Sequence, residues 1–197
     1  VATDGHRLAY AAEVLPSAPT PIEVILPRKT VLELSRQLAD NDDPLEIILT
    51  PTQARFSFGG IELVSKLIDG KFPDYERVIP QHHSKLIKLS RNTLLHSLLR
   101  AAILTNEKFR GVRLVLGSGS LKIISSNAEQ EEAQEEIEID YGGEALDVGF
   151  NVTYLLDVLN NVSNEIIELH LADANSSALF VLPGNETFKY VVMPMRI

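Results

Sequence analysis

The stretch NVTYLLDVLNN at residues 151–161 predicts a helix from about Val152 to Asn161. Its leucines, at positions 155, 156 and 159, recur at helical spacing on one side, and Asn151 is a candidate N-cap. Two other segments have the same character. They predict helices over about 29–40 and about 91–104, the latter capped by Ser90.

Most of the remaining chain predicts short strands, because β-branched and aromatic residues alternate between turn residues. The predicted strands are 22–26, 45–49, 54–58, 62–67, 86–89, 112–116, 121–125, 135–139, 145–149, 166–171, 178–182 and 188–193. The glycines at 59–60, 117–120 and 183–184 predict hairpins. Because helices do not alternate with strands, we expect an α+β fold with antiparallel sheets and few helices.

A weak internal repeat organises the chain. The segments 27–73 and 151–194 each contain a predicted helix, several strands and a closing Phe-Pro or Met-Pro pair. A further helix and several strands precede the second copy, whereas only a short segment precedes the first. We therefore expect the back part of one domain at 1–82 and one complete domain at 83–197.

Composition limits the function. The chain of 197 residues has no cysteine, which excludes disulfide scaffolds, thiolate zinc sites and cysteine nucleophiles. No apolar run is long enough to cross a membrane, and we expect a cytoplasmic protein. The net charge of −9 is opposite to that of proteins that grip nucleic acid through its phosphates.

Motifs for catalysis or metal binding are weak. No phosphate-binding glycine motif precedes a helix, and His82 and His83 are adjacent with no third ligand at a recognisable spacing. We expect neither a metal nor another cofactor. One enzymatic alternative stays open, a small hydrolase that uses Thr3, Asp4 and His6.

Two other features have both a structural and a functional interpretation. Residues 129–147 carry nine acidic side chains and no basic one, which is typical of a solvated face or of a docking surface for a basic partner. The chain ends in YVVMPMRI at 190–197, which is either a last strand with an apolar end or an adaptable surface for partners.

Five long segments resemble the bacterial sliding clamps, the beta subunits of DNA polymerase III. They are VATDGHRLA at 1–9, SKLIDGKFPDYERVIP at 65–80, NEKFRGVRL at 106–114, FNVTYLLDVL at 150–159 and YVVMPMR at 190–196. The resemblance covers essentially the whole chain, which begins within the family's second domain. It implies the DNA clamp fold, in which three domains per subunit form a head-to-tail dimeric ring.

The resemblance also implies a function without catalysis. The ring encircles double-stranded DNA and confers processivity, so that a net charge of −9 is no contradiction. Polymerases, the clamp loader and repair proteins insert short linear peptides, of the Gln-x-x-Leu-Phe type, into a groove between the second and third domains. The positions that match this groove are Thr3, Gly5, His6, Arg7, Leu8, Pro73, Arg77, Val78, Asn151, Tyr154, Ser177, Val191, Met193, Pro194, Met195 and Arg196.

Two further surfaces are implied in the same way. Arg28, Lys29 and Arg110 are the candidates for facing DNA. The ring interface matches Ile103, Leu104, Glu129, Glu131, Glu132 and Glu135. Because the first domain of the family is not in this sequence, we expect these 197 residues to be monomeric, whereas the full-length protein is a homodimer.

Overall fold

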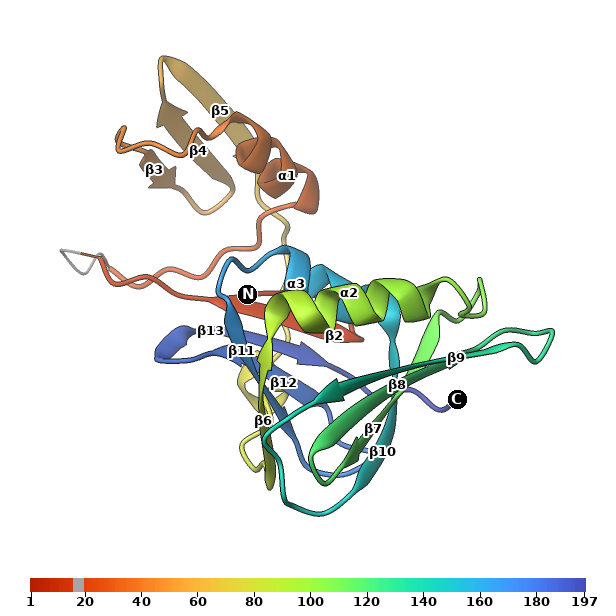
Figure 1. Ribbon diagram of the computed structural model, residues 1–197. Helices are drawn as coiled ribbons and strands as arrows, with labels where there is room; N and C mark the ends of the chain where they lie inside the picture. Colours follow the sequence, from red (N-terminus) through yellow and green to blue (C-terminus); the bar gives the residue numbers. More distant parts are fainter. Residues whose placement is uncertain (16–19) are drawn as a thin grey trace. The chain divides into compact units, whose positions relative to one another are not determined.

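The computed structural model describes residues 1–15 and 20–197 and divides them into two compact units. The larger unit combines Val1–Val14 with Tyr75–Ile197, and the smaller unit is Leu15–Asp74. Every strand pairing among the described residues is antiparallel, as the sequence predicts (Figure 1). The domain ranges 1–82 and 83–197 stay a prediction.

The larger unit contains two sheets. The six-stranded sheet has the spatial order β1-β2-β13-β12-β11-β6, with β1 Ala2–Thr3, β2 Arg7–Ala11, β13 Asn185–Val192, β12 Ala178–Leu182, β11 Ile166–Leu171 and β6 Lys85–Ser90. The four-stranded sheet has the order β10-β7-β8-β9, with β10 Leu146–Asn151, β7 Gly111–Gly117, β8 Ser120–Ser126 and β9 Glu132–Glu138.

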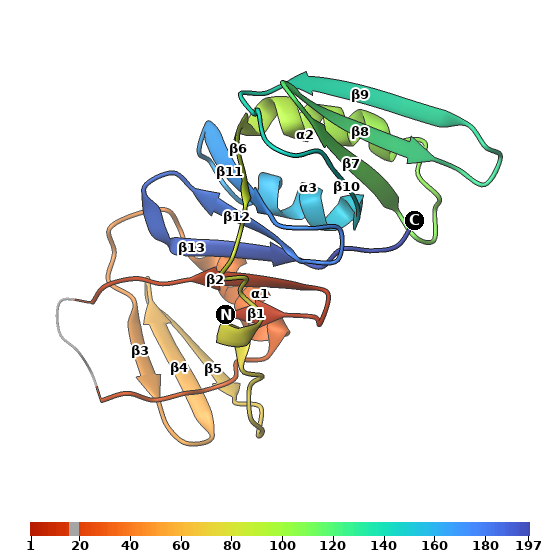
Figure 2. The same cartoon turned by 90° about the horizontal axis from the view of Figure 1, so that it is seen from below.

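Helices α2, Arg91–Ala102, and α3, Val152–Asn160, pack on each other and against strands of both sheets (Figures 1 and 2). Both predicted N-caps are confirmed, because the side chains of Ser90 and Asn151 accept hydrogen bonds from backbone N–H groups in the first turn of each helix. Leu98 of α2 and Leu155 of α3 are buried at the centre of the resulting core. Burial of these apolar stripes holds the two sheets and two helices together.

The sequence predicts neither β1 nor β2. Strand β2 is the longer of the two. It pairs with β13, with Leu8 opposite Val191 and Tyr10 opposite Lys189. Figure 1 shows β2, near the red end of the chain, beside β13 at the blue end. The first residues of the chain therefore extend the sheet formed by the last ones.

The predicted hairpins are confirmed, and one predicted strand is wrong. The turn at Gly59-Gly60 connects β4, Gln53–Phe58, to β5, Ile61–Lys66. The turns at 117–120 and at 183–184 connect β7 to β8 and β12 to β13. Residues 22–26 form no strand, although the backbone oxygen of Ile25 accepts a hydrogen bond from the N–H of Ile68, 2.9 Å away. The β-branched residues of this segment favoured a strand, but the segment forms no ladder of hydrogen bonds with a neighbouring strand.

The smaller unit consists of helix α1, Arg28–Gln37, and a sheet of β3 Glu46–Leu49, β4 Gln53–Phe58 and β5 Ile61–Lys66. Ala54 and Phe56 of β4 are buried, and the Thr30 hydroxyl lies 2.7 Å from that of Ser65. Val31 of the predicted amphipathic stripe is 49% exposed. Few apolar side chains are therefore buried in the described part of this unit.

Candidate functional site

A tight turn joins β1 to β2 and is held by side chains of the segment TDGHR. The Thr3 hydroxyl donates to the backbone oxygen of Arg7 at 2.7 Å and accepts from the N–H of Gly5 at 3.2 Å. One carboxylate oxygen of Asp4 accepts from the N–H groups of His6 and Arg7, at 3.0 and 3.1 Å. Gly5 has φ +86°, a conformation that favours glycine and permits the tight turn.

The Arg7 guanidinium is the electrostatic centre of the site. It forms ion pairs with Asp4, at 3.1 Å, and with Asp157 of α3. Its Nη1 donates to the Tyr190 hydroxyl at 3.3 Å, and its carbon Cζ lies 4.4 Å from the centroid of the Tyr154 ring. These contacts join the turn, α3 and β13, so that Arg7 has a defined orientation.

The pKa values follow from these contacts. Partial burial opposes the charged forms of both partners, but hydrogen bonds from the His6 N–H and from Arg7 keep the pKa of Asp4 below its usual value. The Asp157 carboxylate likewise raises the pKa of Arg7. Burial raises the pKa of Tyr190, so its phenol stays neutral. At neutral pH the site therefore holds an ion-pair network beside a neutral hydroxyl.

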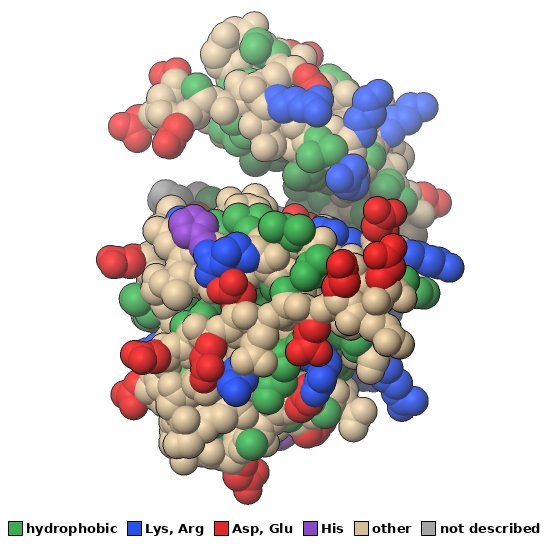
Figure 3. All heavy atoms as spheres, turned by 45° about the vertical axis from the view of Figure 1, so that its right-hand side comes forward, with side chains coloured by type: hydrophobic (Ala, Val, Ile, Leu, Met, Phe, Trp, Pro, Cys, Tyr) green, Lys and Arg blue, Asp and Glu red, His purple; other side chains and the backbone are tan. Residues whose placement is uncertain are grey.

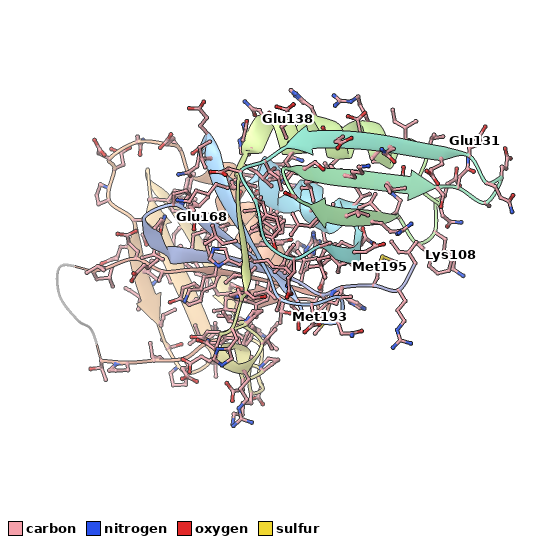
Figure 4. The ribbon with its side chains drawn as sticks, turned by 60° about the horizontal axis from the view of Figure 1, so that its bottom comes forward. Lys108, Glu131, Glu138, Glu168, Met193 and Met195 are labelled. Carbon is pink, nitrogen blue, oxygen red and sulfur yellow. The ribbon has the colours of Figure 1, made fainter. Side chains whose placement is uncertain are left out.

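An apolar strip runs next to this network. Leu8 and Val191 are 1% and 0% exposed and form a buried cluster with Ile79 and Leu179. Met193, just after β13, is 42% exposed, and its N–H donates to the backbone oxygen of His6 at 2.9 Å. The strip thus combines a buried floor with one accessible thioether (Figure 4).

The C-terminal segment is tied to β10. The N–H of Met195 donates to the backbone oxygen of Gly149 at 2.8 Å, and the two residues form an isolated β-bridge. A Cβ at Gly149 would lie 2.5 Å from the Met195 carbonyl oxygen, so only glycine permits this approach. Figure 4 shows Met193 and Met195 along this segment.

Most of the predicted groove residues lie close together in the larger unit. The turn and β2 contribute five of them, Asn151 and Tyr154 belong to β10 and α3, and five more come from Val191 and the tail. The rings of His6 and Tyr154 have centroids 6.4 Å apart. Val78, 36% exposed, follows the 3-10 turn Tyr75–Arg77. Ser177 is half-buried before β12, whereas Pro73 belongs to the smaller unit and is not placed relative to the others.

The hydrolase alternative has no support in this geometry. The Thr3 hydroxyl is engaged by the backbone, and the Asp4 carboxylate by backbone N–H groups and Arg7. No hydrogen bond joins Thr3, Asp4 and His6 as nucleophile, acid and base through their side chains within the described part of the chain. These residues build a turn and do not assemble a triad.

The predicted DNA-facing residues lie in separate units. Arg28 and Lys29 are exposed at the start of α1. Arg110 is half-buried, and its guanidinium donates to the Ala102 carbonyl at the end of α2, 3.2 Å away. The structure therefore gives Arg110 a helix-capping contact, and the contact of these three residues with DNA stays a prediction.

The predicted ring-interface residues lie after α2 and around β9. Ile103 is 79% exposed and Leu104 is half-buried. Glu135 pairs with Arg100 within the chain, with 2.9 Å between Oε1 and Nε. Glu131 lies in the loop before β9, far along the strand from Glu138 in Figure 4. On the face drawn in Figure 3, acidic and basic side chains are interspersed.

The described residues form neither a metal site nor a membrane-spanning helix. Residues 1–15 and 20–197 contain no group of three or more His, Asp or Glu side chains that could hold a metal ion. No helix in those same ranges is long and apolar enough to span a membrane.

Two residues of the site escaped the sequence analysis. Asp157 and Tyr190 both contact the Arg7 guanidinium, and neither belongs to the predicted groove set. Asp157 lies three positions after Tyr154 on α3, where two side chains share a helix face. This three-residue spacing could have pointed to Asp157 from the sequence. The contact of Tyr190 with Arg7 could not be found in this way, because it depends on the pairing of β13 with β2.

Two family models match almost the whole chain. The model of the DNA polymerase III beta subunit, C-terminal domain, matches residues 76–196, and that of the central domain matches residues 1–74. Together they support the predicted resemblance, although residues 1–14 match the central-domain model and belong to the larger compact unit.

Several relatives are similar along the whole chain. The beta sliding clamps of Pseudomonas putida, Pseudomonas aeruginosa and Escherichia coli are 51%, 49% and 44% identical to it. Each alignment covers 100% of this chain and 54% of the relative, so the chain spans about half the length of these proteins.

Solved structures have the same fold. The DNA polymerase III subunit beta of Pseudomonas aeruginosa has a TM-score of 0.95 at 48% identity, covering 100% of this chain and 54% of that one. The pol III beta of Caulobacter crescentus has a TM-score of 0.92 at 40% identity, covering 100% and 53%. The expected α+β clamp fold is therefore confirmed.

Proposed function

Because this chain belongs to the DNA polymerase III beta subunit family, we propose that the whole protein is a sliding clamp, a non-catalytic processivity factor that encircles DNA in the cytoplasm. The identity of 44–51% to beta sliding clamps along the entire chain supports this proposal. A closed ring holds DNA by encircling it, so strong contacts with the DNA phosphates are not required. A net charge of −9 is therefore compatible with this role.

Within the clamp, this chain would be the part that holds partner peptides from polymerases and the clamp loader. The carrying observation is the strip in which the buried Leu8 and Val191 lie beside the exposed Met193 and the fixed cation of Arg7. Apolar anchors of a peptide would bury on the strip, and a peptide carboxylate or carbonyl would meet Arg7. A mostly apolar lining with a few oriented polar groups is typical of such pockets.

A substitution at Met193 tests this proposal. A fluorescent pentapeptide of the Gln-x-x-Leu-Phe type is titrated with the wild-type chain and with Met193→Lys. We expect the variant to bind at least about ten-fold more weakly, because the peptide would have to desolvate an ammonium group. The free energy of unfolding should change little, since Met193 is 42% exposed.

Met193→Leu is the matched control, because it retains an apolar side chain of similar volume. It should bind within about two-fold of the wild type. Equal affinity for the lysine variant, or no binding of the peptide by the wild-type chain, would overturn the proposed groove.

A further inference from the structure

A cavity in the larger unit lies outside the groove set. It has a volume of about 220 Å³, and its lining consists of Tyr10, Tyr75, Glu76, Ile79, Gln81 and Lys189. A space of roughly 150 Å³ is sufficient to hold a benzene ring. The cavity is therefore large enough for one aromatic side chain.

The strand register makes this cavity a continuation of the peptide strip. Side chains two positions apart on a strand point to the same face. Leu8 and Tyr10 thus share one face of β2, and Val191 and Lys189 share one face of β13, with Leu8 opposite Val191 and Tyr10 opposite Lys189. The cavity is one cross-strand pair, about 7 Å, beyond the strip.

The buried cluster that contains Leu8, Ile79 and Val191 contributes both to the strip and to the cavity. Ile79 is 7% exposed, lines the cavity and packs with Leu8 and Val191. The half-buried rings of Tyr10 and Tyr75 pack against the same cluster. A peptide bound at the strip would therefore have its flanking residues next to the cavity.

The lining suits an aromatic ring. The rings of Tyr10 and Tyr75 have centroids 6.1 Å apart and are tilted by 35°, which leaves ring edges and faces for a third aromatic partner. The Lys189 ammonium lies 5.5 Å from the centroid of the Tyr10 ring and forms no ion pair with a carboxylate among the described residues. Such a cation can face a second ring as well.

We propose that this cavity is a specificity subsite that receives an aromatic side chain one to three residues outside the anchor motif of a partner peptide. The proposal rests on the proposed function of the strip and adds a second determinant to it. Partners with the same anchors would then differ in affinity through their flanking residues.

Extended peptides test the subsite. The Gln-x-x-Leu-Phe pentapeptide is lengthened by three residues at either end, with one Phe scanned through the three added positions and Ala at the others, and each is compared with an all-Ala extension. We expect Phe in at least one position to raise the affinity of the wild-type chain about five-fold over its Ala counterpart. Tyr10→Ala and, separately, Lys189→Ala should reduce that gain without changing the affinity for the pentapeptide.

Two variants are used because Tyr10→Ala removes a ring that packs on the core, whereas Lys189 lies at the cavity rim. Glu186→Ala, an exposed position on the same strand, is the matched control and should keep the full gain. If no Phe position improves binding, or if the gain persists in both cavity variants, the subsite does not exist while the groove stands. If the pentapeptide itself fails to bind, both proposals fall.

Discussion

At the scale of single residues, Arg7 organises the candidate site. Its side chain contacts the turn, α3 and β13 together, through Asp4, Asp157 and Tyr190. Its side chain is 27% exposed, so part of the guanidinium remains available to a ligand. A charge held this way is pre-oriented, and a peptide that binds it pays little additional ordering entropy.

The pKa of Asp4 makes the stability of this turn dependent on pH. The folded pKa is below the usual value, so the ionised carboxylate stabilises the fold above pH about 4, and this contribution is lost as the pH falls through the lower, folded pKa. Asp4→Asn should lower the free energy of unfolding at pH 7 by about 0.5–1 kcal/mol, a modest value because the carboxylate is partly solvated.

Urea unfolding from about pH 7 into the acid range provides the measurement, because the difference between the wild type and the variant should shrink as the pH falls through the folded pKa of Asp4. Glu107→Gln, at an exposed position of the same unit, should leave the pH dependence unchanged. An Asp4→Asn chain with the full acid dependence of the wild type would show that Asp4 is not responsible.

At the scale of elements, the site depends on two additions to the sheets. Strand β2 extends the six-stranded sheet at β13, and the tail contacts β10 through the Gly149–Met195 bridge. Each addition brings predicted groove residues to a surface that the core helices and hairpins already support. The termini of the chain thus shape the site, and its interior supplies the rigid base.

A methyl group at Gly149 should displace the tail. In Gly149→Ala the new Cβ would lie 2.5 Å from the Met195 carbonyl oxygen, which is backbone and cannot move alone. We expect about 1–3 kcal/mol of destabilisation and a peptide affinity lowered about five-fold, measured by urea unfolding and by peptide titration.

Gly111→Ala is a matched comparison in the neighbouring strand. Its Cβ would meet the end of the Ile197 side chain at 3.0 Å, and a flexible side chain can move aside. This variant should therefore lose less stability and keep its peptide affinity. Equal effects of the two substitutions would argue against a fixed position of the tail.

At the scale of the whole molecule, we expect the charge on an outer sheet edge to influence assembly. Strand β9 is the last strand of its sheet, and Glu132, Glu136 and Glu138 on it are exposed. Two copies that joined these edges would bring acidic side chains together, which is unfavourable. An edge of this kind favours a basic partner over a second copy of itself.

The expected monomer follows from this edge and from the proposed ring. Sedimentation velocity of the 197-residue chain at micromolar concentration should give a single monomeric species. Raising the salt concentration to about 1 M would screen the repulsion and serves as the control for charge. A stable dimer at low salt would contradict both the interface assignment and the role of the acidic edge.

The sequence by itself determined the local elements and the family. The helices at 91–102 and 152–160, their Ser90 and Asn151 caps and the glycine hairpins depend on contacts within a few residues, which a pattern encodes directly. The five clamp-like segments predicted the family for the same reason, since they are contiguous in the chain.

Only the tertiary structure decided where the site lies and what completes it. Strand β2 exists because β13 pairs with it from the other end of the chain, and no local pattern around residues 7–11 specified that partner. The contacts of Arg7 with Asp157 and Tyr190, and the cavity beside Tyr10, follow from this register. Contacts between residues more than a hundred positions apart depend on packing, and packing is a property of the folded chain.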